Sequence, residues 1–135
     1  MKDNILDNIP KNISIVDRAK YISKTVRDIG FDWENIDHVF EKVEEEFEEI
    51  REEINYENKK NVDKIKEEIG DLIFSLINLT DYLDFDIREA LEVTNKKFIE
   101  RFKYVENSLK NKNSDLSQAT IEEMERLWNK AKNKS

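Results

Sequence analysis

Apolar residues recur three and four positions apart along most of this chain, which is the spacing of one face of a helix. The first 13 residues break this spacing, are polar and hold the single proline, so they are predicted to form an irregular arm. Ser14 precedes Asp17 by three positions, a pattern typical of a helix start. A first helix is expected from there to about Ile29, where Gly30 ends it.

A second helix is expected after Asp32, and a third after the polar stretch 56–61. The second helix carries an apolar stripe of Phe40, Val43, Phe47, Ile50 and Ile54. The third helix carries a longer stripe of Ile65, Ile69, Leu72, Leu76, Leu79 and Leu83. If the helices pack through these stripes, they form an antiparallel hairpin.

A fourth helix is expected to begin near Asp86, three positions before Glu89. Its stripe comprises Leu91, Thr94, Phe98, Phe102, Val105 and Leu109. After a loop over residues 111–119, a short last helix is expected from Thr120, paired with a glutamate three positions on, to about Lys132.

The pattern as a whole predicts an all-α fold, a helical bundle built on the antiparallel hairpin. Two glycines and one proline in 135 residues leave few turn formers, which favours long helices with short connections. We expect one domain over residues 14–132 and a frayed tail at 133–135. Only 38% of the residues are apolar, so the core is thin, and a homodimer is expected to complete it.

Charge and composition exclude several classes of function. The net charge of −8 disfavours binding to a nucleic acid polymer or an anionic membrane surface. The chain has no cysteine and one histidine, which excludes thiolate metal sites and leaves no support for a serine triad. No signal peptide or membrane-spanning stretch is recognised, so a cytoplasmic location is expected.

One acidic pattern occurs twice. The segments 42–50 (KVEEEFEEI) and 64–72 (KIKEEIGDL) lie 22 residues apart. In order along the chain, both contain a lysine, an apolar residue, a variable position, two acids, an apolar residue, a second variable position, an acid and an apolar residue. A polar turn separates them, so the two copies fall on the two helices of the expected hairpin.

Within each copy, two acids three positions apart are neighbours on the helix and border the apolar stripe. These pairs are Glu46 with Glu49 and Glu68 with Asp71. Two carboxylates about 6 Å apart repel by about 3 kcal/mol at an effective dielectric near 20. The side chains therefore spread into water, retain protons, or hold a cation. An all-oxygen ligand set favours Mg²⁺, with Mn²⁺ as the second choice.

The acids have two other interpretations. Glutamate-rich helices are common, and a solvated surface explains either pair alone. A di-iron bundle also uses carboxylates from several helices, but it needs Glu-x-x-His pairs, which this chain lacks. The matched repeat is what favours a metal site.

A second group of candidate residues lies in the last two helices. Asn95, Lys97 and Arg101 follow one another on the fourth helix, and arginine can bind phosphate through two hydrogen bonds. Arg101 lies between two phenylalanines that are expected in the core. Trp128 in the last helix can pack in the core or stack on a base, and Lys132 follows one turn later. Core packing is expected for Trp33.

Taken together, these motifs resemble the MazG family of nucleoside triphosphate pyrophosphohydrolases over residues 15–132. The matching segments are GFDW at 30–33, EEFEE at 45–49, EEIGD at 67–71, KFIERF at 97–102 and LW at 127–128. Each motif is short, and the specificity lies in their shared order and spacing.

The resemblance implies a helical, dimeric, Mg²⁺-dependent enzyme that hydrolyses nucleoside triphosphates to the monophosphate and pyrophosphate. It implies that Glu46, Glu49, Glu68 and Asp71 hold the metal, that Lys97 and Arg101 hold the triphosphate, and that Trp128 lies near the base. Asn78, Asn95 and Lys132 are further substrate-binding candidates.

Glu45 is a candidate general base, although its helical phase points away from the stripe. Two alternatives stay open: a narrower pyrophosphatase for dUTP, dCTP or an abnormal nucleotide, and a non-catalytic acidic helical interaction module.

Overall fold

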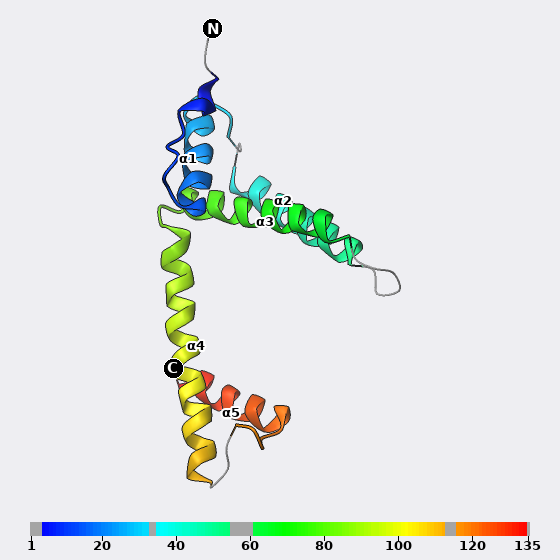
Figure 1. The fold of residues 1–135 in the computed structure, drawn as a ribbon, viewed down its shortest axis with the longest axis vertical. Coiled ribbons are helices and arrows are strands. Elements are labelled where there is room, and N and C mark those ends of the chain that lie inside the picture. Colours follow the sequence, from blue (N-terminus) through cyan, green and yellow to red (C-terminus); the bar gives the residue numbers. More distant parts are fainter. Residues whose placement is uncertain (1–3, 33–34, 55–60, 113–115, 135) are drawn as a thin grey trace. The chain divides into compact units, whose positions relative to one another are not determined.

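The computed structural model describes residues 4–32, 35–54, 61–112 and 116–134. These residues form a short 3-10 helix and five α-helices, with no strand in the described ranges (Figure 1). The elements are η1 (Ile5–Asn8), α1 (Ile15–Asp28), α2 (Ile36–Glu53), α3 (Val62–Tyr82), α4 (Ile87–Asn111) and α5 (Ile121–Lys134). The all-α fold class is therefore confirmed. None of the described helices is both long enough and apolar enough to cross a membrane.

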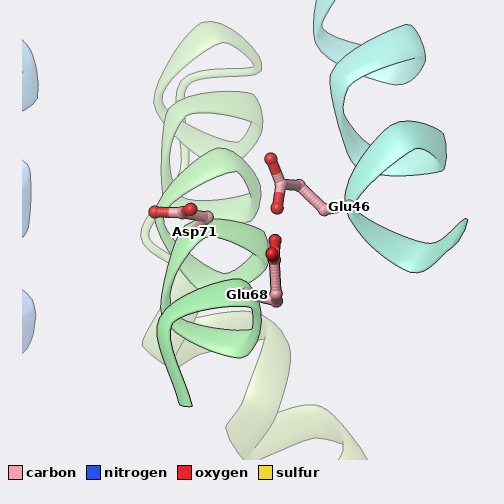
Figure 2. Close-up of side chains that lie close together, drawn as sticks. All are labelled: Glu46, Glu68 and Asp71. Atoms are coloured by element: carbon pink, nitrogen blue, oxygen red, sulfur yellow. The ribbon is translucent and has the colours of Figure 1, made fainter. Parts of the chain in front are cut away.

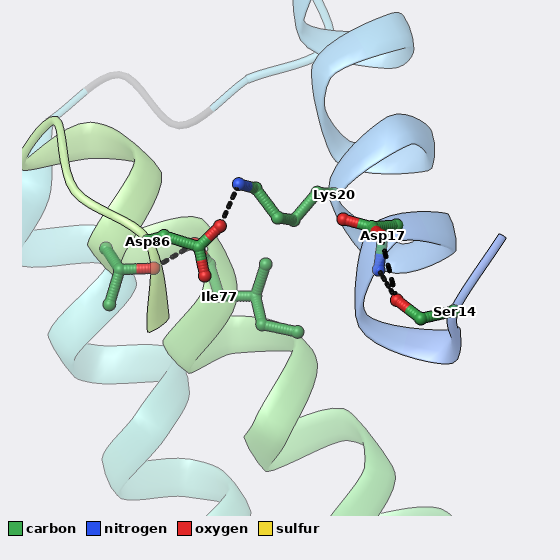
Figure 3. A network of polar contacts seen from close by, with 6 residues as sticks. Ser14, Asp17, Lys20, Ile77 and Asp86 are labelled. Atoms are coloured by element: carbon green, nitrogen blue, oxygen red, sulfur yellow. Dashed lines mark hydrogen bonds and ion pairs between the residues drawn. The ribbon is translucent and has the colours of Figure 1, made fainter. Parts of the chain in front are cut away.

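The helix boundaries follow local capping chemistry. The Ser14 side chain accepts a hydrogen bond from the Asp17 backbone N–H at 3.0 Å and begins α1 as predicted (Figure 3). Gly30, with φ of 98°, follows the end of α1 in the left-handed region that glycine adopts without strain. The Thr120 hydroxyl accepts from the Glu123 N–H and begins α5.

Three predicted boundaries differ from the structure. The arm contains η1, because the Asn4 N–H donates to the Asp7 carboxylate across one turn. Asn35, rather than Asp32, caps α2 by accepting from the backbone N–H three residues on. The last helix continues to Lys134, past the predicted end near Lys132.

The chain forms two compact units, residues 1–87 and 88–135, and each is described by itself. In the first unit α2 and α3 lie side by side as the expected hairpin, and α1 packs on α3 (Figure 1). Lys20 of α1 forms an ion pair with Asp86, the residue before α4 (Figure 3). In the second unit Val105 and Leu109 of α4 pack against Leu127 of α5.

The hairpin buries residues outside the predicted stripes, while most of the stripe residues are half-buried. The buried residues are Val39 and Glu46 on α2 and, among others, Glu68 and Ser75 on α3. Phe40, Phe47 and Ile69, predicted to be in the core, are exposed. Two of the predicted border acids thus lie inside the seam rather than at its edge.

Candidate metal centre

The seam between α2 and α3 brings three acids together. Glu46 and Glu68 are buried, at 1% and 4% exposure, and Asp71 lies one turn further along α3, at the surface. One carboxylate oxygen from each lies within 4.8 Å of the others. Glu46 reaches from α2 toward Glu68 on α3, and Asp71 lies beside them (Figure 2). Residues from both copies of the acidic repeat therefore meet at one place.

The fourth predicted acid, Glu49, belongs to the same cluster. Its carboxyl group makes a hydrogen bond with Glu68, and this contact, followed by desolvation and the neighbouring carboxylates, raises the pKa of Glu49 to about 7. The same hydrogen bond is the main cause that lowers the pKa of Glu68, with Lys64 and Glu46 adding to it. In the metal-free protein near neutral pH, a proton on Glu49 is thus shared with an ionised Glu68.

This proton predicts a pH dependence of stability in the metal-free protein. Glu49 has a higher pKa folded than its ordinary 4.5, so the folded state binds the proton more tightly. The stabilisation that this proton gives to the folded state is fully present below about pH 4.5 and is lost as pH rises through about 7. We expect the melting temperature in EDTA to fall across that window, and the fall to be absent in Glu49→Gln.

Thermal unfolding of the wild type and of Glu49→Gln at pH values from 5 to 8 measures how the melting temperature changes with pH. This range spans the raised pKa of Glu49. Glu48→Gln, an exposed neighbour on the same helix turn, serves as the control and should keep the wild-type slope. A Glu49→Gln protein with an unchanged slope would contradict the shared proton.

Each buried acid has a lysine partner one turn earlier on its own helix. Lys42 Nζ lies 2.8 Å from Glu46 Oε1, and Lys64 Nζ lies 3.2 Å from Glu68 Oε1. Proximity to Glu46 and Glu68, respectively, raises the pKa of each lysine, so both remain charged. The lysine that opens each copy of the repeat is thus the counter-ion of the acid at its centre.

The donor set fits a hard divalent cation. Glu46 Oε2 is buried and has no hydrogen-bond partner among the described residues, which is costly unless something else binds it. The surrounding ligands are all carboxylate oxygens, the preference of Mg²⁺ and Mn²⁺. The side chains that would hold such an ion are Glu46, Glu49, Glu68 and Asp71.

A cavity of about 380 Å³ adjoins this cluster in the first unit. Asp71 forms part of its wall, so the cavity begins at the most exposed of the clustered acids. Its other lining residues come from α1, α2, α3 and the segment after α1: Ser23, Val26, Arg27, Phe31, Asp32, Lys42, Phe74, Ser75 and Asn78. Among the predicted substrate-binding residues, Asn78 lies here and accepts a hydrogen bond from the Ser23 hydroxyl.

The second unit holds an aromatic cluster around Arg101. The Arg101 guanidinium lies 6.0 Å from the centre of the Trp128 ring, within the range of a cation–π contact. Phe98 packs on Trp128 at 4.7 Å between ring centres and stacks with Phe102 at 6.4 Å. Phe98 and Phe102 are exposed, so the prediction that they belong to the core is wrong. Trp128 packs partly against the core of Val105, Leu109 and Leu127.

The remaining candidates are placed as follows. Lys97, Asn95 and Lys132 are exposed on α4 and α5 of the second unit. Glu45 is exposed on α2, with Lys42 Nζ 4.0 Å from its Oε1. Trp33 and the polar turn at 56–60 lie outside the described residues.

Several residues around the site were not singled out from the sequence. Arg27 and Phe74 line the cavity, and nothing in their spacing reveals it, because the cavity forms only when α1 packs on α3. The two lysine counter-ions had a signal, since a lysine opens both acidic segments at the same place.

Comparison with known proteins adds a family to this geometry. The model of the MazG nucleotide pyrophosphohydrolase domain matches residues 34–106. The chain is 34% identical over 131 residues to the nucleoside triphosphate pyrophosphohydrolase/pyrophosphatase MazG of Thermotoga maritima, covering 97% of this chain and 49% of that protein. It is also 34% identical over 130 residues to the nucleoside triphosphate pyrophosphohydrolase of Escherichia coli, covering 94% and 48%.

A third relative, the protein YabN of Bacillus subtilis, is 40% identical over 68 residues, 50% of this chain and 14% of that protein. The chain thus spans about half the length of the two pyrophosphohydrolases that it matches. The matched domain contains α2, α3 and all four clustered acids. On these grounds, the chain belongs to the MazG nucleotide pyrophosphohydrolase domain family.

Proposed function

We propose that this protein hydrolyses nucleoside triphosphates to the monophosphate and pyrophosphate with Mg²⁺, or Mn²⁺ in its place. The observation that carries the proposal is the buried Glu46 Oε2 atom without a hydrogen-bond partner among the described residues, inside a cluster of carboxylates at the edge of a cavity. Such a cluster is stable when a divalent cation holds it together. The names of the relatives from Thermotoga maritima and Escherichia coli support the same reaction.

In this proposal Glu46, Glu49, Glu68 and Asp71 hold the metal. When bound, a divalent ion neutralises phosphate charge and acidifies a water molecule. Asp71 is the acid that also lines the cavity, so it marks where the phosphates meet the cluster. Glu45 remains the candidate that takes the proton from the attacking water.

The cavity is proposed to receive the nucleoside part of the substrate. Its volume of about 380 Å³ lies within the range of small-molecule sites. Phe31 and Phe74 supply apolar wall for a base, and Asn78 supplies polar atoms. As the family resemblance implies, Lys97 and Arg101 stay proposed ligands of the triphosphate, and Trp128 stays a proposed contact of the base. Asn95 and Lys132 are further candidates for the same substrate.

The reaction itself has a direct test. The purified protein is incubated with each common nucleoside triphosphate and Mg²⁺, and both pyrophosphate and orthophosphate are measured. We expect pyrophosphate and nucleoside monophosphate in equal amounts. In ¹⁸O-labelled water the label should enter the monophosphate, because the water oxygen bonds to the α-phosphorus while the bond to the bridging oxygen breaks and pyrophosphate leaves.

Orthophosphate as the sole product would overturn the proposal. Activity confined to dUTP, dCTP or a modified base within the panel would instead assign the narrower pyrophosphatase. A melting temperature unmoved by Mg²⁺ with a non-hydrolysable nucleotide would favour the non-catalytic interaction module, because a ligand that binds the folded state alone must stabilise it.

We also propose that the protein is a homodimer joined through one face of the α2–α3 hairpin. Phe40, Phe47 and Ile69 each follow a buried seam residue by one position, whereas the cavity residue Phe74 precedes one. One position is about 100° of helix rotation, so these two sets point to opposite faces of the hairpin. The three exposed residues, together with Ile73, form what we call the apolar face. A second copy of the chain would cover this face.

The cytoplasmic location of the protein stays a prediction.

A further inference from the structure

The cations of α1 differ in whether they have a partner within the protein. Arg18 donates to a backbone carbonyl, and Lys20 and Lys24 each form an ion pair with an aspartate. The side chain of Arg27 is half-buried, yet it makes no hydrogen bond or ion pair with any residue in the described ranges. It lines the cavity that is proposed to receive the nucleoside. A partly desolvated guanidinium without an acceptor is costly, so this position favours a ligand that supplies one.

The end of α1 places an aromatic residue beside this arginine. Gly30 turns the chain with φ of 98°, and the Phe31 N–H donates to the Val26 carbonyl at 2.9 Å. The backbone of Phe31 is thereby held against the last turn of α1, and Val26, Arg27 and Phe31 line the same cavity. Phe31 is 77% exposed, so its ring is open to a flat partner. An aromatic ring next to a guanidinium suits a base, which stacks on the ring and offers the acceptors of its edge to the donors.

The charge on this part of the wall favours a base over a phosphate. Asp32 follows Phe31 and also lines the cavity. Its carboxylate repels a phosphate, whereas it accepts hydrogen bonds from the N–H groups of a base. Guanine has two acceptors on one edge, O6 and N7, and N–H donors at N1 and N2. Arginine donates to O6 and N7 together, but adenine presents a donor in the place of O6.

We propose that Arg27 selects guanine nucleotides, by donating to O6 and N7 of a base that stacks on Phe31, with Asp32 accepting from the N–H groups of that base. The inference rests on the proposed function, because it names the base for the same cavity. It gives the unpartnered guanidinium of α1 an acceptor and the exposed ring of Phe31 a partner.

The test compares two nucleotides that differ in the base alone. Binding of the α,β-methylene analogues of GTP and ATP is measured by calorimetry with Mg²⁺, so that hydrolysis does not intervene. Wild type should bind the GTP analogue about 10- to 100-fold more tightly than the ATP analogue. In Arg27→Met the two Kd values should come within about threefold of each other, because only the GTP analogue loses a contact. Arg18→Met removes an arginine of the same helix that does not line the cavity, and it should keep the wild-type ratio.

A second comparison needs no variant. The analogue 7-deaza-GTP keeps every atom of GTP except the N7 acceptor, so in wild type its KM for pyrophosphate release should be about 10-fold above that of GTP, with kcat within about threefold. In Arg27→Met the two KM values should be equal.

The outcomes separate this inference from other roles of Arg27. If wild type binds the two methylene analogues equally, or if Arg27→Met weakens both by the same factor, as the loss of a phosphate contact would, the inference is overturned. Wild type that prefers the GTP analogue but releases pyrophosphate from no nucleotide would contradict the proposed function and leave the base assignment standing. Thermal melting of Arg27→Met should match wild type, because the side chain has no partner among the described residues to lose.

Discussion

Replacing Glu46 by glutamine is expected to lower the rate of pyrophosphate release by at least about 100-fold. Glutamine keeps the shape of the side chain, but its amide removes one negative charge and replaces a carboxylate oxygen by a donor. The position is 1% exposed, so water cannot take the place of the lost ligand atom. The Mg²⁺-dependent rise in melting temperature should disappear with the activity, because both depend on the same oxygen.

Glu44→Gln is the matched control for this experiment. It removes the same charge from an exposed position half a turn earlier on α2, and it should keep wild-type activity within about twofold. Calorimetric titration with Mg²⁺ shows whether a loss of activity comes from a loss of metal binding. A Glu46→Gln protein that binds Mg²⁺ with wild-type affinity would exclude Glu46 as a ligand.

The second large effect is expected at Phe47, on the apolar face of the hairpin. Phe47→Asp places a charge where we propose that two copies meet, and should raise the dimer Kd by at least about 100-fold. The wild-type side chain is 56% exposed in the single chain, so the substitution should leave the fold of each copy intact. Sedimentation equilibrium measures the change, and circular dichroism checks the helix content.

Ile121→Asp is the control, since it makes an equivalent exchange at a residue that is 64% exposed in the first turn of α5. An acid there is favoured by the helix dipole, and the residue belongs to the second unit, whereas the apolar face belongs to the first. Wild-type protein that sediments as a monomer at micromolar concentration would end the dimer proposal, whatever the variants do.

Helix boundaries could be predicted from the sequence because they depend on local chemistry. Ser14 and Thr120 begin helices by accepting hydrogen bonds from residues three positions away, and Gly30 follows the end of α1 with a positive φ. Each of these signals is complete within about five residues, so no tertiary contact is needed to recognise it. The cap of α2 could not be predicted in this way, because Asp32 and Asn35 are both good cap residues and the sequence does not choose between them.

The packing phase of the hairpin could not be predicted in the same way. The apolar pattern placed Phe40, Phe47 and Ile69 inside, whereas the structure buries Glu46 and Glu68 one position earlier. Glutamate is treated as a surface residue in pattern analysis, because burying it is costly unless it is paired. Here each buried acid has its own lysine, which lowers that cost.

The sequence could predict which acids would lie close together, but not how their side chains are arranged. The repeat showed that four carboxylates would meet if the two helices paired, and the structure brings Glu46, Glu68 and Asp71 together, with Glu49 hydrogen-bonded to Glu68. The metal-binding roles of these acids stay predictions. The cavity beside them depends on how α1 packs against α3, a contact that no short motif encodes.

The ion pairs within α2 and α3 have a consequence for assembly. Each lysine and its acid lie on the same helix, four residues apart, so neutralisation accompanies helix formation. The hairpin can therefore fold with no ion present, unlike small zinc domains whose folding waits for the metal. A chelator would then leave the hairpin folded with its metal site unoccupied. Adding the cation back would refill the site without refolding of the chain.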